Sequence, residues 1–228
     1  FNNTAHSNGV NGLRIYPTYL PVKNPCDPSS GPAQQEFRNL TSFHNGEHGI
    51  FGKQNGALTH TNHKLVENAA ADLSWVKLQS VVYDEAPHIK NSLFVATPNP
   101  SARPYRGAGK VGLHTPGYEF FKIDGATFVN YGTQGAIATC SECDRDDTLR
   151  QGGYTIRTRG LKFINSAKKV KWTTPKKDIL FDQDGSLTGA ANSSVTYYRK
   201  FNNWPECTVD TTGEFDYGQS CGPSVRIR

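Results

Sequence analysis

The stretch that decides the fold is Gly125–Asn130 (GATFVN), because it returns later in the chain as Gly160–Asn165 (GLKFIN). Lys90–Val95 (KNSLFV) is a fainter echo of the same unit. Nearer the N-terminus, Asn8–Leu13 (NGVNGL) returns as Asn45–Ile50 (NGEHGI). These matches indicate a chain built from internal repeats, in which the unit is a short apolar strand, an Asn and a turn.

Repeats of this kind have a physical explanation. A short strand cannot bury its apolar face alone, but stacked repeats can align Phe, Leu, Ile and Val in one continuous core. Asn suits the corners because it tolerates left-handed backbone conformations, and Gly suits the tightest positions. The pattern therefore predicts an all-β fold, a right-handed parallel β-helix (solenoid), over residues 1–200. Pro-rich stretches predict loop insertions near 17–34 and 98–116, and 201–228 form a Cys-containing C-terminal extension.

Only Leu65–Gln79 carries a helical pattern, since Leu65, Ala69, Leu73 and Val76 would share one helix face. The same segment also alternates in the manner of a strand. Periodicity alone does not choose between the two.

Composition excludes several classes of protein. The 228 residues include 12 Phe, 10 Tyr and 3 Trp, which supply the apolar area that disordered chains lack. No apolar run reaches the roughly 18 residues of a membrane-spanning helix, so we expect membrane association only through parts absent from this sequence. The chain begins at Phe1 without a leader, which predicts a processed product or a piece of a longer protein, joined to other domains of a parent chain.

The net charge of +5 is spread along the chain, except for one basic cluster. That cluster consists of Lys168, Lys169, Lys171, Lys176 and Lys177. It lacks the aromatic interleaving of a nucleic-acid interface, so we expect no nucleic-acid partner. A solvated surface is the favoured interpretation, and contact with an anionic glycan is the alternative.

Three Asn-x-Ser/Thr acceptors, at Asn2, Asn39 and Asn192, accompany the cysteines and predict a glycoprotein of the secretory route. The localisation that follows is extracellular or at the cell surface.

The five cysteines also suggest specific pairings. For Cys140-x-x-Cys143 a structural disulfide is favoured over a redox pair or half a zinc site, because neither a βαβ pattern nor a second knuckle accompanies it. A bond between Cys207 and Cys221 would close a loop of about 15 residues, for which chain entropy gives roughly 3 kcal/mol. Cys26 is left for a partner segment outside this sequence.

The segment Asp182-x-Asp184-Gly185-Ser186 looks like a calcium loop. It fails as an EF-hand, because Gly185 comes too early and position 193 is Ser. Calcium binding by the two carboxylates stays open, and otherwise we expect no cofactor. The favoured interpretation is that both carboxylates cap backbone amides at a corner.

Four histidines, His44, His48, His60 and His63, would form a patch if successive repeats stacked them on one face. Such a patch could bind a transition metal or a sugar. Ordinary exposed turn histidines are the favoured interpretation. Gly46 argues against a metalloprotease helix over His44–His48.

Glycosidase chemistry would need two carboxylates facing each other across a groove. Glu47 and Asp72 are the candidate pair in the best repeat region, although no spacing singles them out. A scatter of surface acids is the simpler account. No nucleophile elbow, phosphate-binding loop or dinucleotide fingerprint is present, so the sequence offers no assembled catalytic site.

The region Gly125–Gly189 contains a series of distinctive segments, in the following order: TFVNY at 127–131, AIATCSEC at 136–143, GGYTIR at 152–157, GLKFINS at 160–166 and DQDGSLTG at 182–189. In these segments the region resembles the β-helical ectodomain of the fibrocystin and fibrocystin-L family, more closely fibrocystin-L. The last of these segments resembles a signature of cell-surface hyaluronidases of the cell-migration-inducing and transmembrane types. The early segment Ala5–Tyr16 looks like an upstream repeat of the same region.

This resemblance implies a non-catalytic extracellular module that serves as a rigid scaffold and recognises glycans or partner proteins at a cell or ciliary surface. A hyaluronidase-like enzyme acting on polysaccharides is the alternative that the shared signature implies. A third hypothesis is self-association into an extracellular filament, because a β-helix fragment exposes its open ends.

Overall fold

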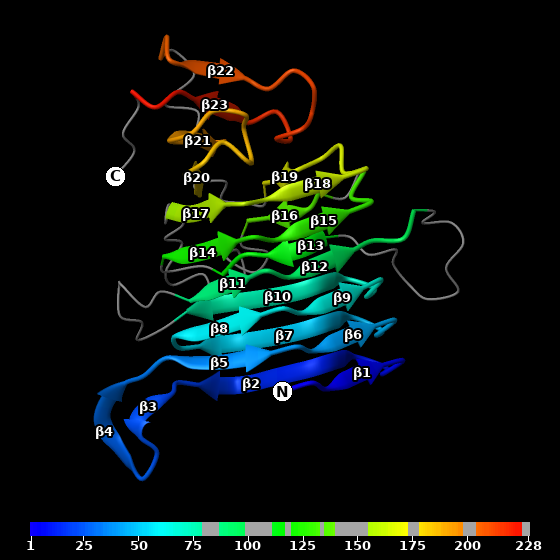
Figure 1. Cartoon of the computed structure of the whole chain (residues 1–228), viewed down its shortest axis with the longest axis vertical. Coiled ribbons are helices and arrows are strands. Elements are labelled where there is room, and N and C mark those ends of the chain that lie inside the picture. The colour runs from blue at the N-terminus through cyan, green and yellow to red at the C-terminus, as the bar shows by residue number, and fades with distance from the viewer. Residues whose placement is uncertain are drawn as a thin grey trace.

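The computed structural model describes residues 1–78, 87–98, 111–116, 120–132, 135–139, 155–172, 178–197 and 204–224. Every regular element in these ranges is a β-strand, which confirms the all-β prediction. None of the described residues forms a helix capable of crossing a membrane. The strands are stacked from β1 at one end to the C-terminal strands at the other (Figure 1).

Three main sheets make up the stack. Sheet 1 contains, in spatial order, β1 (Thr4–His6), β6 (Thr41–Phe43), β9 (Lys64–Val66), β12 (Leu93–Val95), β15 (Thr127–Val129) and β18 (Lys162–Ile164). Sheet 2 contains β2 (Asn11–Tyr19), β7 (His48–Asn55), β10 (Ala71–Leu78), β13 (Val111–His114), β16 (Ile137–Ala138) and β19 (Val170–Lys171). Sheet 3 contains β5 (Gln35–Arg38), β8 (Leu58–Thr61), β11 (His88–Lys90), β14 (Phe121–Asp124), β17 (Thr155–Arg159) and β20 (Ile179–Asp182), followed by β21 (Ser193–Thr196), β23 (Gln219–Cys221) and β22 (Cys207–Val209).

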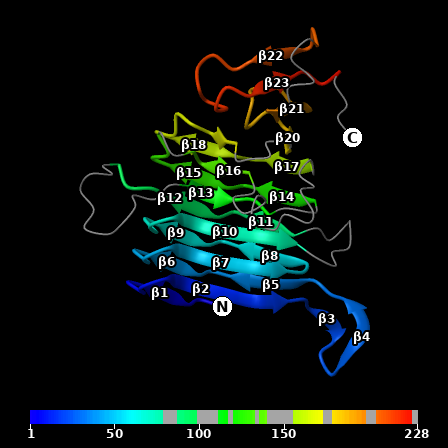
Figure 2. The same cartoon turned by 180° about the vertical axis from the view of Figure 1, so that it is seen from behind.

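The chain visits sheets 1, 2 and 3 in rotation, and each strand pairs in parallel with its counterpart from the next round, up to β20. We call one such round a repeat. The sequence matches predicted the register: Phe128 of β15 pairs with Phe163 of β18, and Leu13 of β2 pairs with Ile50 of β7. The view from behind shows the same succession (Figure 2).

Left-handed backbone conformations mark the two corners that flank sheet 1. The corner before its strands has φ values from 47° to 69° at Asn2, Asn39, Asn62, Asn91, Gly125 and Gly160. The corner after them has φ values from 49° to 66° at Ser7, His44, Glu67, Asn130 and Asn165. Asn and Gly dominate because they tolerate this region best, so the predicted role of Asn at corners is confirmed.

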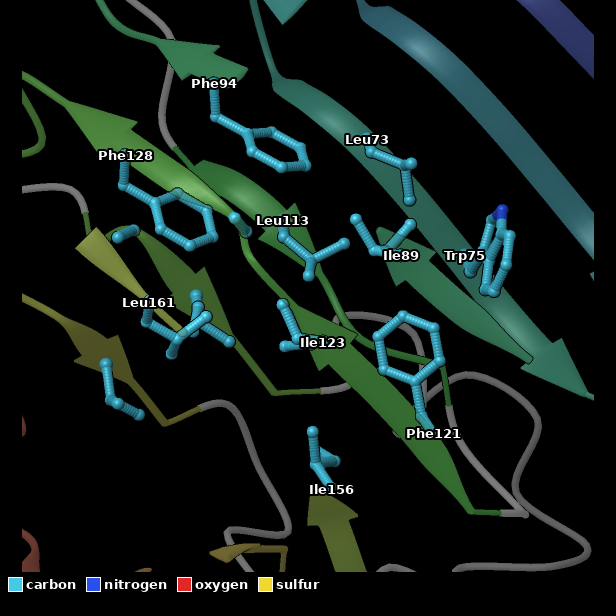
Figure 3. Close-up of a cluster of buried hydrophobic side chains, with 14 of the residues drawn as sticks. Leu73, Trp75, Ile89, Phe94, Leu113, Phe121, Ile123, Phe128, Ile156 and Leu161 are labelled. Carbon is cyan, nitrogen blue, oxygen red and sulfur yellow. The ribbon is translucent and has the colours of Figure 1, made fainter. Parts of the chain in front are cut away.

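The core runs through the middle of the stack. Trp75, Phe94, Phe121 and Phe128 are essentially inaccessible to solvent. They point inward from all three sheets together with Leu113, Ile89 and other aliphatic side chains (Figure 3). Truncating one such residue typically lowers the free energy of unfolding by about 2–5 kcal/mol. Many short strands together therefore bury enough apolar surface to stabilise the fold, which a single short strand could not do.

The segment with ambiguous periodicity, Leu65–Gln79, is extended, because β9 and β10 occupy it. Its apolar residues are divided between two sheets, with Leu65 in sheet 1 and Leu73 and Trp75 in sheet 2. The helical spacing is therefore coincidental.

The expected insertions have more regular structure than loops. An antiparallel hairpin of β3 (Val22–Asn24) and β4 (Asp27–Pro32) follows β2, and the β2 ladder shifts register between Ile15 and Thr18, around Pro17. Within 98–116, Val111–His114 is strand β13 rather than loop, because Leu113 is needed in the core; 99–110 lie outside the described residues. In sheet 3, antiparallel pairing starts at β21, so the change from parallel pairing comes before residue 201, where the C-terminal extension was expected to begin.

Candidate functional site

A ladder of asparagine side chains occupies the corner between sheets 1 and 2 in the early repeats. Asn8 donates from its backbone N and Nδ2 to Asn45 Oδ1, at 3.1 and 2.8 Å. Asn45 donates in the same way to Asn68 Oδ1, and Asn68 to Asp72 Oδ1 at 3.2 and 2.8 Å. We call Asn8, Asn45, Asn68 and Asp72 the Asn ladder; it satisfies backbone donors that would otherwise be buried without partners.

The Asn ladder, together with Ser42 beside it, explains the second glycine of the repeated N-G-x-x-G motif. A Cβ on Gly12 would lie 2.1 Å from Ser42 Oγ, and one on Gly49 would lie 2.7 Å from Asn68 Nδ2. Both distances are far below contact, so only glycine lets the strands of sheet 2 pass the ladder.

The candidate carboxylates lie in different surroundings. Asp72 is buried and ends the Asn ladder, and its Oδ2 accepts a hydrogen bond from the Tyr131 hydroxyl. Glu47 has an exposed side chain, with its carboxylate 3.8 Å from His48 Nδ1. Donors already occupy both oxygens of Asp72, as in a structural carboxylate.

The four histidines divide into two pairs rather than one patch. His44 is exposed and its Nε2 lies 2.8 Å from Glu67, whereas His48 contacts Asn11 Oδ1 at 3.0 Å. His60 and His63 are buried inside the stack, so the interpretation of these two residues as exposed turn histidines is wrong. The reason is packing, since the ring of His60 stacks on Phe37 and meets Trp75 edge-on.

The buried pair is linked by hydrogen bonds that fix its tautomers. The backbone N–H of Leu40 donates to His63 Nδ1 at 3.0 Å, so the proton of His63 is on Nε2 and points to His60 Nδ1, also at 3.0 Å. Burial lowers the pKa of His63 to about 4 and holds the pKa of His60 well below its usual value. Both rings are therefore neutral at pH 7.

The turn that looked like a calcium loop uses its carboxylates as backbone caps. Asp182 is fully buried; its Oδ1 accepts from Gly185 N at 3.0 Å, and its Oδ2 accepts from Leu187 N and Thr188 N at 3.0 and 2.8 Å. Asp184 accepts from Gly160 N and Ser186 N, and these bonds lower its pKa against the opposing effect of burial. Across the described ranges, no group of three or more His, Cys, Asp or Glu side chains could hold a metal ion.

The three glycosylation acceptors are exposed, and all lie in the left-handed region, with φ values of 58°, 56° and 59° at Asn2, Asn39 and Asn192. Asn39 Nδ2 donates to Asn2 Oδ1 at 2.9 Å.

The cysteines have separate fates. Cys207 and Cys221 form a disulfide across the paired strands β22 and β23, which confirms that prediction. Cys26 is an exposed free thiol. Cys140 and Cys143 lie outside the described residues.

The basic cluster near the C-terminal end is partly neutralised by a segment that follows it. Lys168 forms an ion pair with Asp216 at 2.7 Å, and Lys169 with Glu214 at 2.6 Å. Lys176 and Lys177 lie outside the described residues.

Sequence analysis missed a second basic surface, the outward face of β11, β14 and β17 in sheet 3. Its cationic side chains are Lys90, Lys122, Arg157 and Arg159. The burial alternation in these strands, with Ile89, Phe121 and Ile123 inward, is the signal that would have found it.

Known proteins are similar to this chain over most or nearly all of its length. The chain is 33% identical to fibrocystin of Mus musculus over 229 aligned residues, which cover 98% of the chain and 5% of that protein. This chain is similar to a segment of fibrocystin. Fibrocystin of Canis lupus familiaris is 32% identical over an alignment that covers 85% of this chain and 4% of that protein. Fibrocystin-L of Homo sapiens is 24% identical over an alignment that covers 99% of this chain and 5% of that protein.

The similarity to fibrocystin and fibrocystin-L agrees with the resemblance drawn from the motifs, although the identity is higher to fibrocystin than to fibrocystin-L. The chain spans about one twentieth of the length of these relatives. No protein-family model matches the chain.

Proposed function

We propose that the chain is a right-handed parallel β-helix that acts as a rigid extracellular module of a large fibrocystin-like surface protein and presents a recognition surface for glycans or partner proteins. The observation that carries this proposal is the rotation of the chain through three sheets, with parallel pairing between successive repeats. Stacked repeats that share one core form a stiff support with long side faces.

The extracellular setting has independent support. The Cys207–Cys221 disulfide is a bond that persists in oxidising compartments. The three glycosylation acceptors are exposed, so glycans at Asn2, Asn39 and Asn192 would not disturb the core. A cell surface, ciliary or otherwise, is the location we propose for the parent protein.

A recognition role fits the candidate residues better than catalysis. Asp72 and Asp182 are buried and saturated by donors from the protein, and both stabilise corners of the stack. Asp182 begins the segment with the hyaluronidase-like signature, and its hydrogen bonds from backbone amides support a structural role for that segment.

Secretion from mammalian cells tests the proposal. We expect a soluble glycoprotein that loses mass on treatment with peptide N-glycosidase, and hydrogen exchange that is slow in strands of all three sheets together. Retention as aggregate, or rapid exchange in one sheet only, would overturn it.

The same preparation tests the enzymatic alternative. We expect no shortening of hyaluronan or mixed glycosaminoglycans, with or without calcium. Depolymerisation that disappears in Glu47→Gln or Asp72→Asn, but not in the exposed control Glu206→Gln, would contradict a non-catalytic role.

A further inference from the structure

Two neighbouring columns of side chains on the outward face of sheet 3 differ in charge. In one column, Asp124 of β14 is in register with Lys90 of β11 and with Arg159 of β17, and Arg159 Nε donates to Asp124 Oδ2 at 2.8 Å. In the other, Lys122 of β14 is in register with Arg157 of β17. Like charges directly opposite each other destabilise a sheet, so this second column is an electrostatic cost to the fold.

Within the described residues, no carboxylate forms an ion pair with Lys122 or Arg157, and none does so with Lys90 on β11. The guanidinium of Arg157 lies 5.7 Å from the ring of Phe120, a contact that orients it without neutralising it.

The field of these cations is visible at their neighbour His88, which is in register with Lys122. The pKa of His88 falls to about 4, chiefly through burial and then through Lys90, with a smaller contribution from Lys122, although Asp124 lies 3.8 Å away and acts in the opposite direction. His88 is therefore neutral at pH 7, and the face keeps four cations against one carboxylate.

We propose that the outward face of β11, β14 and β17 binds a sulfated polysaccharide, with Lys90, Lys122 and Arg157 as its anion contacts. Adjacent strands are about 4.8 Å apart, so an extended polymer along the Lys122–Arg157 column meets a cation on each of those two strands, and Lys90, in the neighbouring column on β11, adds a third. Such a polymer supplies the negative charge that the Lys122–Arg157 column lacks. This inference rests on the proposed extracellular function and names the ligand class of its recognition surface.

The face fits this ligand better than other polyanions. Its outward side chains are His88, Lys90, Lys122, Asp124, Thr155, Arg157 and Arg159. None of these side chains is apolar, so none would enter a bilayer. The aromatic rings that border the face, Phe120 and Phe181, are both partly buried, and the Arg157 guanidinium lies 5.7 Å from Phe120, so neither is an open platform on which bases would stack. Towards β5 the face ends in a hollow lined by Gln34, Gln35, Glu36, Thr59 and Lys90, where Glu36 introduces negative charge.

The test uses the secreted chain and size-defined heparin fragments, with chondroitin sulfate, unsulfated hyaluronan and neutral dextran as comparisons. We expect heparin to bind most tightly and to be released as sodium chloride is raised. A variant with Lys90→Gln, Lys122→Gln and Arg157→Gln should bind at least about tenfold more weakly.

A matched control removes the same charge elsewhere. Lys23, Lys64 and Lys162 are exposed and form no ion pair among the described residues. Their triple replacement by Gln should change heparin affinity by less than about threefold, since scattered charges act only through the screened overall field. Asp124→Asn, which removes the carboxylate from the face, should strengthen binding, and it tests the idea even if the triple variant does not fold.

Three results would overturn the inference: no heparin binding by the wild-type chain, equal loss in the two triple variants, or equally tight binding of phosphatidylserine vesicles or single-stranded DNA through the same residues. If the chain is secreted, folded and protected from exchange but fails here, only this inference fails. If it is not secreted or does not fold, the proposed function fails first.

Discussion

The early and late repeats fill the same corner between sheets 1 and 2 in different ways. In the first two repeats the inward side chains of sheet 1 are small, Ala5 and Ser42, and the Asn ladder begins beside them; it ends in the third repeat, where the inward residue is Leu65. In the late repeats the inward positions hold Phe94, Phe128 and Phe163, whose rings stack at centroid distances of 4.9 and 5.5 Å.

This difference teaches that one backbone register supports two kinds of interior. In the early repeats, Asn and Asp side chains accept hydrogen bonds from backbone N–H groups at the corner. In the late repeats, where the inward residues are Phe, the rings stack on one another, and the backbone N–H of Tyr131 donates to Ser166 Oγ at 3.1 Å instead. The Tyr131 hydroxyl joins the two regions by donating to Asp72. The comparison predicts different responses to mutation and to pH.

The largest expected effect is in the aromatic region. Phe128→Ala should lower the free energy of unfolding by about 3–5 kcal/mol, because it opens a cavity between two stacked rings. Chemical denaturation measures this loss. We expect the same loss at pH 7 and pH 5, and a loss below 1 kcal/mol would show that the stack is not the main support of the late repeats.

The Asn ladder should come next. Asp72→Ala leaves Asn68 and the Tyr131 hydroxyl without their buried acceptor, and we expect a loss of about 3 kcal/mol. The exposed Glu47→Ala is the control and should stay within about 0.5 kcal/mol. Equal effects in the two variants would mean that the ladder contributes little.

Acid should weaken the early repeats through His63. Its pKa is about 4 in the folded chain and near 6.5 when unfolded, so the unfolded chain takes up the proton first and stability falls as pH drops from 6.5 towards 4. The expected loss from His63 is about 2 kcal/mol by pH 5.

His63→Asn keeps a side-chain acceptor near Leu40 N and removes the titration, so it should flatten this part of the stability curve. The exposed His44→Asn is the control. His60, His48, His88 and His114, whose pKa values are also lowered by burial, leave a residual slope in both variants. An unchanged slope in His63→Asn would contradict the assignment.

The smallest expected effect is at a corner. Asn165 has a φ of 49° and lies on the surface, so Asn165→Ala should cost about 1 kcal/mol of strain while Asn165→Gly should be nearly neutral. Thermal unfolding of the two variants side by side measures the difference. Equal stability would show that this corner does not depend on left-handed backbone.

The sequence by itself determined the repeat, its register and its corners. The spacing of residues along the chain is local information. Phe128 and Phe163 occupy equivalent places in two copies of one unit, and most corner positions with a left-handed φ hold Asn or Gly, which tolerate it best. The strand assignment of Leu65–Gln79 needed the sheets, because either periodicity fits the letters.

Only the tertiary structure decided which polar groups are free. Nothing local says that Asp72 is saturated by Asn68 and Tyr131, or that Asp216 and Glu214 form ion pairs with Lys168 and Lys169 of the basic cluster. The local sequence also does not show that Lys122 is in register with Arg157, whereas Asp124 is in register with Arg159. Charge and burial depend on neighbours that come from other repeats, and parallel stacking brings those neighbours together across long stretches of chain.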